Sequence, residues 1–212
     1  ASSIIGSVTV ASNSELDGFA IDGGVVGTAV SNVVIERNSI QQNNFGLDGI
    51  FLSSLSNVAG SGIQISDNTI ADGAANGISL SGSDVIASVT GNTANQTTMN
   101  GLLVQGTSFT GTVATNTFET GTGSGIRLDL TSEFHGAVEG NMVRNNGADG
   151  IALFVPVITD AAGTGNASVS GNDASGSDVG IMVFSSNPLL DITNNVADGT
   201  MTGGLISASM TF

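Results

Sequence analysis

The residues best suited to catalysis lie close together in one stretch of the chain, which contains Arg127, Asp129, Glu133, His135 and Glu139. A carboxylate beside a histidine can transfer protons, and a pair of carboxylates can act on a glycosidic bond. All five belong to a single one of the repeats that run through the sequence. The repeats before and after it offer Ser79, Gln105, Ala152 and Phe154 instead of charged residues. We therefore expect an exposed turn with solvated charges, and the sequence predicts no catalytic residues.

A metal site would have to be built from carboxylates, because the chain has no Cys and a single His. Asp17 and Asp48 each precede a glycine that begins a repeat. If their repeats stack directly, the two carboxylates come within about one strand spacing, which favours a cation such as calcium between them. Later repeats continue this position with groups better suited to hydrogen bonding, namely Asn76, Asn100, Ser124 and Asp149. The sequence therefore predicts no cofactor, with calcium at Asp17 and Asp48 as the alternative.

Two short patterns recur along the chain and define these repeats. The first is a glycine followed by an apolar residue, at Gly18-Phe19, Gly49-Ile50, Gly77-Ile78, Gly101-Leu102, Gly125-Ile126, Gly150-Ile151, Gly180-Ile181 and Gly204-Leu205. The second is apolar-x-x-Asn-x-apolar, with its asparagine at Asn38, Asn68, Asn92, Asn116, Asn141, Asn172 and Asn195. Each asparagine precedes the next repeat glycine by 8 to 11 residues, and this near-constant offset indicates a structural repeat.

Within each repeat, apolar residues alternate with other residues, which is typical of short β-strands, and no helical period is sustained. Side chains such as Ile78, Leu80 and Val89 are expected to point inward. Two short strands cannot bury an apolar face alone, but stacked copies can share one core. Burial of that core is expected to be the main stabilising contribution.

The strand Gly77-Ile78-Ser79-Leu80 and the turn Val89-Thr90-Gly91-Asn92-Thr93-Ala94 resemble the right-handed parallel β-helix repeats of the pectate-lyase-like superfamily. The resemblance covers nearly the whole chain. It implies an all-β fold, a right-handed single-stranded parallel β-helix (solenoid) of about eight coils. We expect one domain over 1–212, with an N-terminal coil or edge at 1–17, repeat coils at 18–206 and a C-terminal edge strand at 207–212.

The same resemblance bears on the asparagines and on activity. It implies that one polar residue stacks at a tight turn of each coil. Asn tolerates a left-handed backbone, and its amide both donates and accepts hydrogen bonds, so we expect the seven asparagines to form a structural Asn ladder. In catalytic members of the superfamily, charged side chains from adjacent coils converge on an acidic polysaccharide. That pattern is missing from this sequence, so the resemblance points to a non-catalytic member.

The outward positions of the Gly-Ile-x-Leu strands are mostly apolar and read Ala20, Phe51, Ser79, Leu103, Arg127, Ala152, Met182 and Ile206. Apolar patches on a surface usually mark contacts. We predict that Phe51, Leu103, Met182 and Ile206 form a contact stripe, which a neighbouring chain or a loop of the same chain covers. Segments near 22–34, 53–64 and 154–168 vary in length between repeats, and we expect them to protrude as loops on one side.

Charge argues against several kinds of partner. Three Arg and no Lys stand against 18 acidic residues, which gives a net charge of −15. Nucleic acids and anionic membranes attract basic surfaces, so we expect neither as a partner. The longest apolar stretch, Ile151 to Ile158, is too short to cross a membrane. Arg37 is expected to form a surface ion pair with Asp67 on the next coil.

These observations favour an extracellular or cell-surface protein of bacterial type, a structural or adhesive β-solenoid that is not an enzyme. A surface filament, a sheath or a passenger segment would fit. The alternative is a carbohydrate-active enzyme, either a polysaccharide lyase or a hydrolase, or a phage tailspike-like β-helix that binds polysaccharide; it rests on the resemblance alone. An ice-binding solenoid would need a flat array of outward threonines, and the threonines of the sequence do not fall into one column across all repeats.

The two ends of the chain favour self-association. Residues Ala1 to Val10 and Gly204 to Phe212 are strand-like and carry no charged side chain. Unpaired strand edges recruit further strands unless they are covered or charged. We therefore predict that copies associate head to tail, or that the chain is cut from a longer β-helix. A polysaccharide or a cell surface is the other partner class considered.

Overall fold

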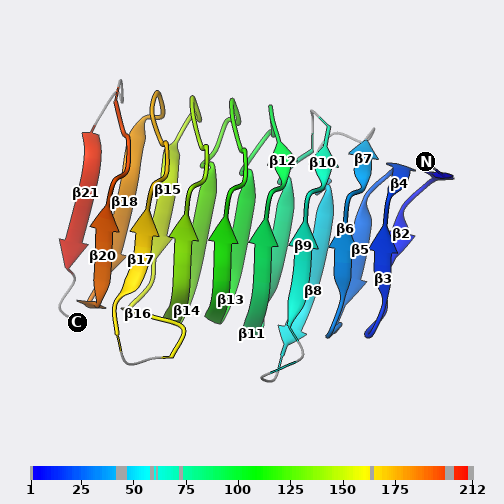
Figure 1. Ribbon diagram of the computed structural model, residues 1–212, viewed down its shortest axis with the longest axis horizontal. Coiled ribbons are helices and arrows are strands. Elements are labelled where there is room, and N and C mark those ends of the chain that lie inside the picture. Colours follow the sequence, from blue (N-terminus) through cyan, green and yellow to red (C-terminus); the bar gives the residue numbers. More distant parts are fainter. Residues whose placement is uncertain are drawn as a thin grey trace.

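The computed structural model describes residues 2–41, 47–57, 60, 62–71, 74–162, 165–198 and 203–209, with the backbone alone at 187, 188 and 203–209. The described residues form strands and turns and no helix. Their strand pairs are parallel. The chain winds as a parallel β-helix whose coils follow one another along the long axis, from the N-terminal end at β1 to β21 (Figure 1). The predicted all-β parallel β-helix is confirmed, and the number of coils stays a prediction.

Strands of successive coils line up at three positions around the coil. The first position holds β2 (Val8–Thr9), β5 (Val25–Thr28), β8 (Ile50–Ser56), β11 (Ile78–Thr90), β13 (Leu102–Ala114), β14 (Ile126–Glu139), β15 (Asp149–Phe154), β18 (Val179–Ser185) and β21 (Gly203–Ser209). The second holds β3 (Glu15–Asp17), β6 (Val34–Glu36), β9 (Ile63–Ser66), the later halves of β11, β13 and β14, β17 (Ala167–Ser170) and β20 (Leu190–Thr193). The third holds β1 (Ser2–Ile5), β4 (Phe19–Asp22), β7 (Ser39–Gln41), β10 (Thr69–Ile70) and β12 (Thr93–Ala94). Two short strands, β16 (Val157–Thr159) and β19 (Asn187–Pro188), pair with each other between the first and second positions.

The longest strands bend from the first position into the second without a break, and glycine permits the bend. A Cβ at Gly106 in β13 would lie 1.9 Å from the carbonyl oxygen of Gly82 on the preceding coil. A Cβ at Gly111 would lie 1.8 Å from the carbonyl oxygen of Ala87. The close approach of the two backbones therefore excludes a side chain at these two positions.

The interior of the solenoid is a continuous apolar core. Inward valines and isoleucines repeat at the same place in each coil, as with Val89, Val113 and Val138, which are fully buried. Phe109 and Phe134 are also fully buried, and their rings stack with centroids 5.7 Å apart. The strand alternation read from the sequence thus corresponds to one core that all coils share.

At the tight turn, the residue before each ladder asparagine has a positive φ. These residues are Arg37, Asp67, Gly91, Thr115, Gly140, Gly171 and Asn194, with φ between 53° and 67°, and Gly18 at the equivalent place before Phe19 has a φ of 72°. The ladder asparagines themselves are not in the left-handed region. The sequence argument that Asn serves here by tolerating that conformation was therefore wrong. Asn contributes hydrogen bonds, while its predecessor makes the turn.

The first repeat was also assigned to the wrong place. Gly18-Phe19 is part of the tight turn, and β4 pairs with β1 and β7 in the third position. The strand that pairs with β8 is β5, which lies inside the segment 22–34 expected to be a loop. The described parts of the segments after β8 and after β15 lie at one edge of the solenoid, at the lower side of Figure 1. Part of the second segment forms β16.

Candidate functional site

The residues of the predicted contact stripe occupy one column on the outside of the first strand position. In order along the column stand Val26, Phe51, Ser79, Leu103, Arg127, Ala152, Met182 and Ile206. Val26 stands where the sequence analysis placed Ala20, because Ala20 belongs to β4 in the third position. A hydroxyl group and a guanidinium group therefore interrupt the apolar members of the column.

Exposure differs along this column. Among the members of the column whose side chains are described, Phe51 is the most accessible at 38% exposed, whereas Leu103 is 8% exposed. Met182 is half-buried, and the side chain of Ile206 lies outside the described residues. Leu103 lines a groove together with Met99 from the turn that precedes its own strand. The same chain therefore covers Leu103, while Phe51 faces outward.

That groove has a volume of about 410 Å³ and a mixed polar and apolar lining. Its lining residues are Thr98, Met99, Asn100, Leu103, Gln105, Thr122, Gly123, Arg127 and Asp129. Arg127 Nε donates a hydrogen bond to Asp129 Oδ2 at 2.8 Å. The two charged groups of the groove thus neutralise each other within one strand.

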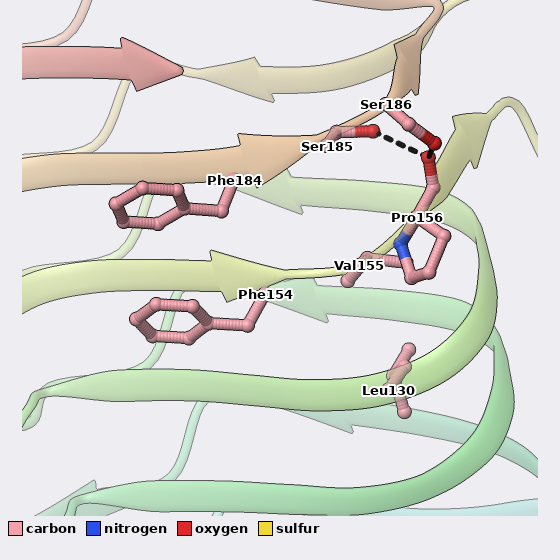
Figure 2. A pocket seen from close by; sticks show the side chains of 7 residues that line it. All are labelled: Leu130, Phe154, Val155, Pro156, Phe184, Ser185 and Ser186. Carbon is pink, nitrogen blue, oxygen red and sulfur yellow. Dashed lines mark hydrogen bonds between the residues drawn. The ribbon is translucent and has the colours of Figure 1, made fainter. Parts of the chain in front are cut away.

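An aromatic pair that the sequence analysis did not single out lies in the next outward column. The rings of Phe154 and Phe184, from β15 and β18, stack with centroids 5.3 Å apart (Figure 2). Arg127 lies on the preceding coil, and its guanidinium carbon is 4.8 Å from the centroid of the Phe154 ring. The signal was present in the sequence, because each Phe follows a repeat glycine, Gly150 or Gly180, by four residues.

Beside this pair lies an apolar cavity of about 190 Å³, lined by Leu130, Phe154, Val155, Pro156, Phe184, Ser185 and Ser186 (Figure 2). The hydroxyl groups of Ser185 and Ser186 both donate hydrogen bonds to the Pro156 carbonyl oxygen, each at 2.9 Å. These bonds tie the coil that contains β18 to the end of β15. The cavity offers apolar contact area and no titratable group.

The seven ladder asparagines form one continuous hydrogen-bonded column. Each Nδ2 donates to the Oδ1 of the next asparagine at 2.9 to 3.0 Å, from Asn38 to Asn195. Each Nδ2 also donates to an inward backbone carbonyl of the preceding coil, as from Asn116 to Val89 at 2.9 Å. Asn38 through Asn172 are at most 2% exposed. At the N-terminal end, the Phe19 amide donates to Asn38 Oδ1, so Phe19 occupies the ladder position of the first turn.

A second polar column runs through Asp48, Asn76, Asn100, Ser124 and Asp149. Asn76 Nδ2 donates to Asp48 Oδ1 at 2.8 Å, and Asn100 Nδ2 donates to Asn76 Oδ1 at 2.9 Å. Asp17 lies elsewhere, in β3 opposite Glu36. The premise for calcium between Asp17 and Asp48 was therefore wrong, because their carboxylates do not stack. Burial raises the pKa of Asp149, which is 9% exposed at the far end of this column.

The charge-dense stretch divides into separate pairs. Glu133 Oε2 lies 3.1 Å from His135 Nε2, and the other ring nitrogen of His135 is hydrogen-bonded to Thr159 Oγ1 on β16. Arg127 and Asp129 pair with each other on the first part of the same strand. The five residues therefore do not converge on one reacting point. The histidine links β14 to β16.

Each of the three arginines is paired with a carboxylate. Arg37 Nη2 lies 2.7 Å from Asp17 Oδ2 and 2.6 Å from Glu36 Oε1, so the expected pair with Asp67 was wrong. Glu15, Asp17 and Glu36 bring carboxylate oxygens within 4.8 Å of one another, and Arg37 offsets their charge. Arg144 pairs with Asp173 and lowers the pKa of that carboxyl to about 2.

Comparison with known proteins adds a family. A family model described as periplasmic copper-binding protein (NosD) matches residues 7–196, from β2 to the last turn of the Asn ladder. No curated protein and no solved structure matches the chain. In the part of the chain that the structure describes, no helix is long and apolar enough for a membrane span.

Proposed function

The chain belongs to the NosD family of periplasmic proteins, and we propose that it is a structural or adhesive β-solenoid of the bacterial cell envelope or surface whose copies stack end to end. It acts through contacts at its ends and along its outer faces, without catalysing a reaction. The family description supports the location, and the surface features of this chain support the mode of action.

The observation that carries this proposal is the state of the two terminal coils. Among the described strands, β2 and β3 each have a partner on one side alone, and so do β20 and β21 at the opposite end. The first strand position runs from β2 to β21, and the second runs from β3 to β20. A second copy placed head to tail would therefore set β21 beside β2 and β20 beside β3, in parallel and at the strand spacing of the solenoid.

The charged stretch supports a non-enzymatic role. Glu133 and Thr159 occupy both ring nitrogens of His135, and Thr159 is 5% exposed. A histidine between a hydroxyl and a carboxylate can activate that hydroxyl as a nucleophile, but only where a substrate reaches it, and Thr159 is buried. The proposal therefore assigns His135 to fastening the segment around β16.

Edge pairing can be tested with a single backbone hydrogen-bond donor. The amides of Val8 and Val10 donate to Gly24 and Val26 on the next coil at 2.9 and 2.8 Å, so the intervening Thr9 amide faces the open side of β2. Thr9→Pro removes this donor and leaves both inner bonds in place. Thr9→Ala is the matched control, because it retains the amide.

We expect the wild-type chain and Thr9→Ala to form concentration-dependent linear oligomers in sedimentation velocity. We expect Thr9→Pro to stay monomeric with an unchanged far-UV spectrum. A wild-type chain that is monomeric at every concentration and salt, or a Thr9→Pro variant that associates like wild type, would contradict the proposal.

A further inference from the structure

The donor groups of this chain do not match the metal named in the description of its family. Copper sites in proteins draw on imidazole, thiolate and thioether ligands. The sequence has no Cys, one His and five Met. Any copper site would therefore hold at most one imidazole and would depend on thioethers or carboxylates for its remaining ligands.

The single imidazole is already engaged. Nδ1 of His135 is hydrogen-bonded to Thr159 Oγ1, and Nε2 lies 3.1 Å from Glu133 Oε2. The side chain of His135 is 20% exposed. A copper ion at either nitrogen would have to displace one of these partners, and displacement of Thr159 would break the side-chain bond that joins β14 to β16 in addition to their backbone pairing.

The described methionines do not converge on the histidine or on one another. Met99 lies in the turn before β13, Met142 follows a ladder asparagine, and Met182 lies in β18. These are three different positions around the coil, on three different coils. Met201 and Met210 lie outside the described residues.

The one cluster of acidic ligand atoms found in the described residues is also unsuited to copper. Glu15, Asp17 and Glu36 form it, and Arg37 Nη2 lies within 2.7 Å of oxygens from two of them. Oxygen-only sites suit hard cations, and the guanidinium group already supplies the positive charge.

We infer that this chain retains the solenoid of the NosD family without a copper site of its own. The residues matched to the family, 7–196, include the whole Asn ladder, from Asn38 to Asn195, and most of the apolar core. What the chain shares with the family is thus the repeat that builds the coils. Its working surfaces are the outer faces and ends.

Copper retention by the full-length chain tests this inference. The chain is loaded separately with Cu(I) and with Cu(II), passed over a desalting column with a competing chelator, and its copper content is measured. We expect the chelator to remove essentially all of the copper, because ions that are only weakly attracted to the acidic surface do not stay bound in its presence. Thermal unfolding with and without copper should give the same Tm. If the chain had a tight copper site, free copper at a hundred times the Kd of that site would raise the Tm by about 5 °C or more.

Retention of about one equivalent of either ion, or such a rise in Tm, would overturn the inference. The variant His135→Asn then identifies the ligand, because loss of retention in it would place the ion at that imidazole. This outcome is separate from the test of end-to-end stacking, which is carried out on the metal-free chain and does not depend on copper content.

Discussion

Asn92 and Asn116 are joined by two hydrogen bonds, although 24 residues separate them in the sequence. Asn116 Oδ1 accepts from the Asn92 backbone amide at 2.9 Å and from Asn92 Nδ2 at 3.0 Å. Asn116 repeats the arrangement with Asn141 on the following coil. Each buried amide is satisfied by its neighbours, so the ladder fixes the register of every coil on the next.

Asn116→Leu should therefore destabilise the fold strongly. The change removes the acceptor of the Asn92 backbone amide and a side-chain donor to the Val89 carbonyl in a buried site, while Asn92 Nδ2 keeps its bond to the Ile65 carbonyl. At about 1 to 3 kcal/mol for each buried group that loses a partner, the free energy of unfolding should fall by about 2 kcal/mol or more. Chemical denaturation followed by circular dichroism measures this loss.

Asn166→Ala is the control for that experiment. Asn166 also bonds to the next coil, through Nδ2 to Asp191 Oδ1 at 2.8 Å, but both residues are exposed. Its loss should cost less than about 1 kcal/mol. If both variants lost the same free energy of unfolding, the buried ladder would stabilise the fold no more than an exposed hydrogen bond does.

Much of the fold could be predicted from the sequence, because the repeat consists of side chains whose structural effects are local. The alternation of apolar residues and the constant offset of the asparagines gave the strands, the inward core and the parallel coils. The first coil was misread because a glycine before an apolar residue arises for two reasons. Gly77 immediately precedes the strand β11, while Gly18 supplies the positive φ of a turn.

The candidate surfaces were harder to predict, because their geometry depends on the register between coils. Arg37 could have paired with Asp67 or with Asp17, and the position of Arg37 beside Asp17 follows from the pairing of β3 with β6. Stacking of Phe154 on Phe184 likewise required both coils to be in register, despite an insertion between them.

End-to-end association should depend on salt. Glu15 and Asp191 are the first and last described members of one outward column, so stacking would place their carboxylates one strand spacing apart. Like charges directly opposite are destabilising, and about 0.5 M salt screens them. Association should therefore increase with salt in sedimentation, and Glu15→Gln should associate with little salt dependence. Glu133→Gln, in a central coil, should behave like wild type.

Asp173 should make part of the stability sensitive to acid. Its pKa is lowered to about 2, chiefly by the hydrogen bond from Arg144, so its contribution is present above the ordinary value and is lost as the pH falls toward 2. Asp173→Asn should lower the free energy of unfolding at neutral pH by about 1 kcal/mol or less, since the pair is partly exposed. The difference from wild type should vanish near pH 2, as urea titrations at several pH values will measure.

Asp149 should make stability depend on pH in the opposite direction from Asp173. Burial raises its pKa, so the stability due to its protonated form is present at low pH and is lost as the pH rises through the raised value. Asp149→Asn keeps a neutral side chain that can still accept from Ser124, and it should be more stable than wild type at pH 7. The gain should disappear below the ordinary carboxyl pKa. A variant that is less stable than wild type at pH 7 would show that the charge is favourable there.

The most direct test of a solenoid that stacks through its terminal strands is cryo-electron microscopy of the purified chain at high protein and salt concentration. We predict filaments in which β21 of one copy continues onto β2 of the next at about 4.8 Å, with the strand columns unbroken across the junction. Single particles with the terminal strands of each copy covered by its own residues would contradict this account.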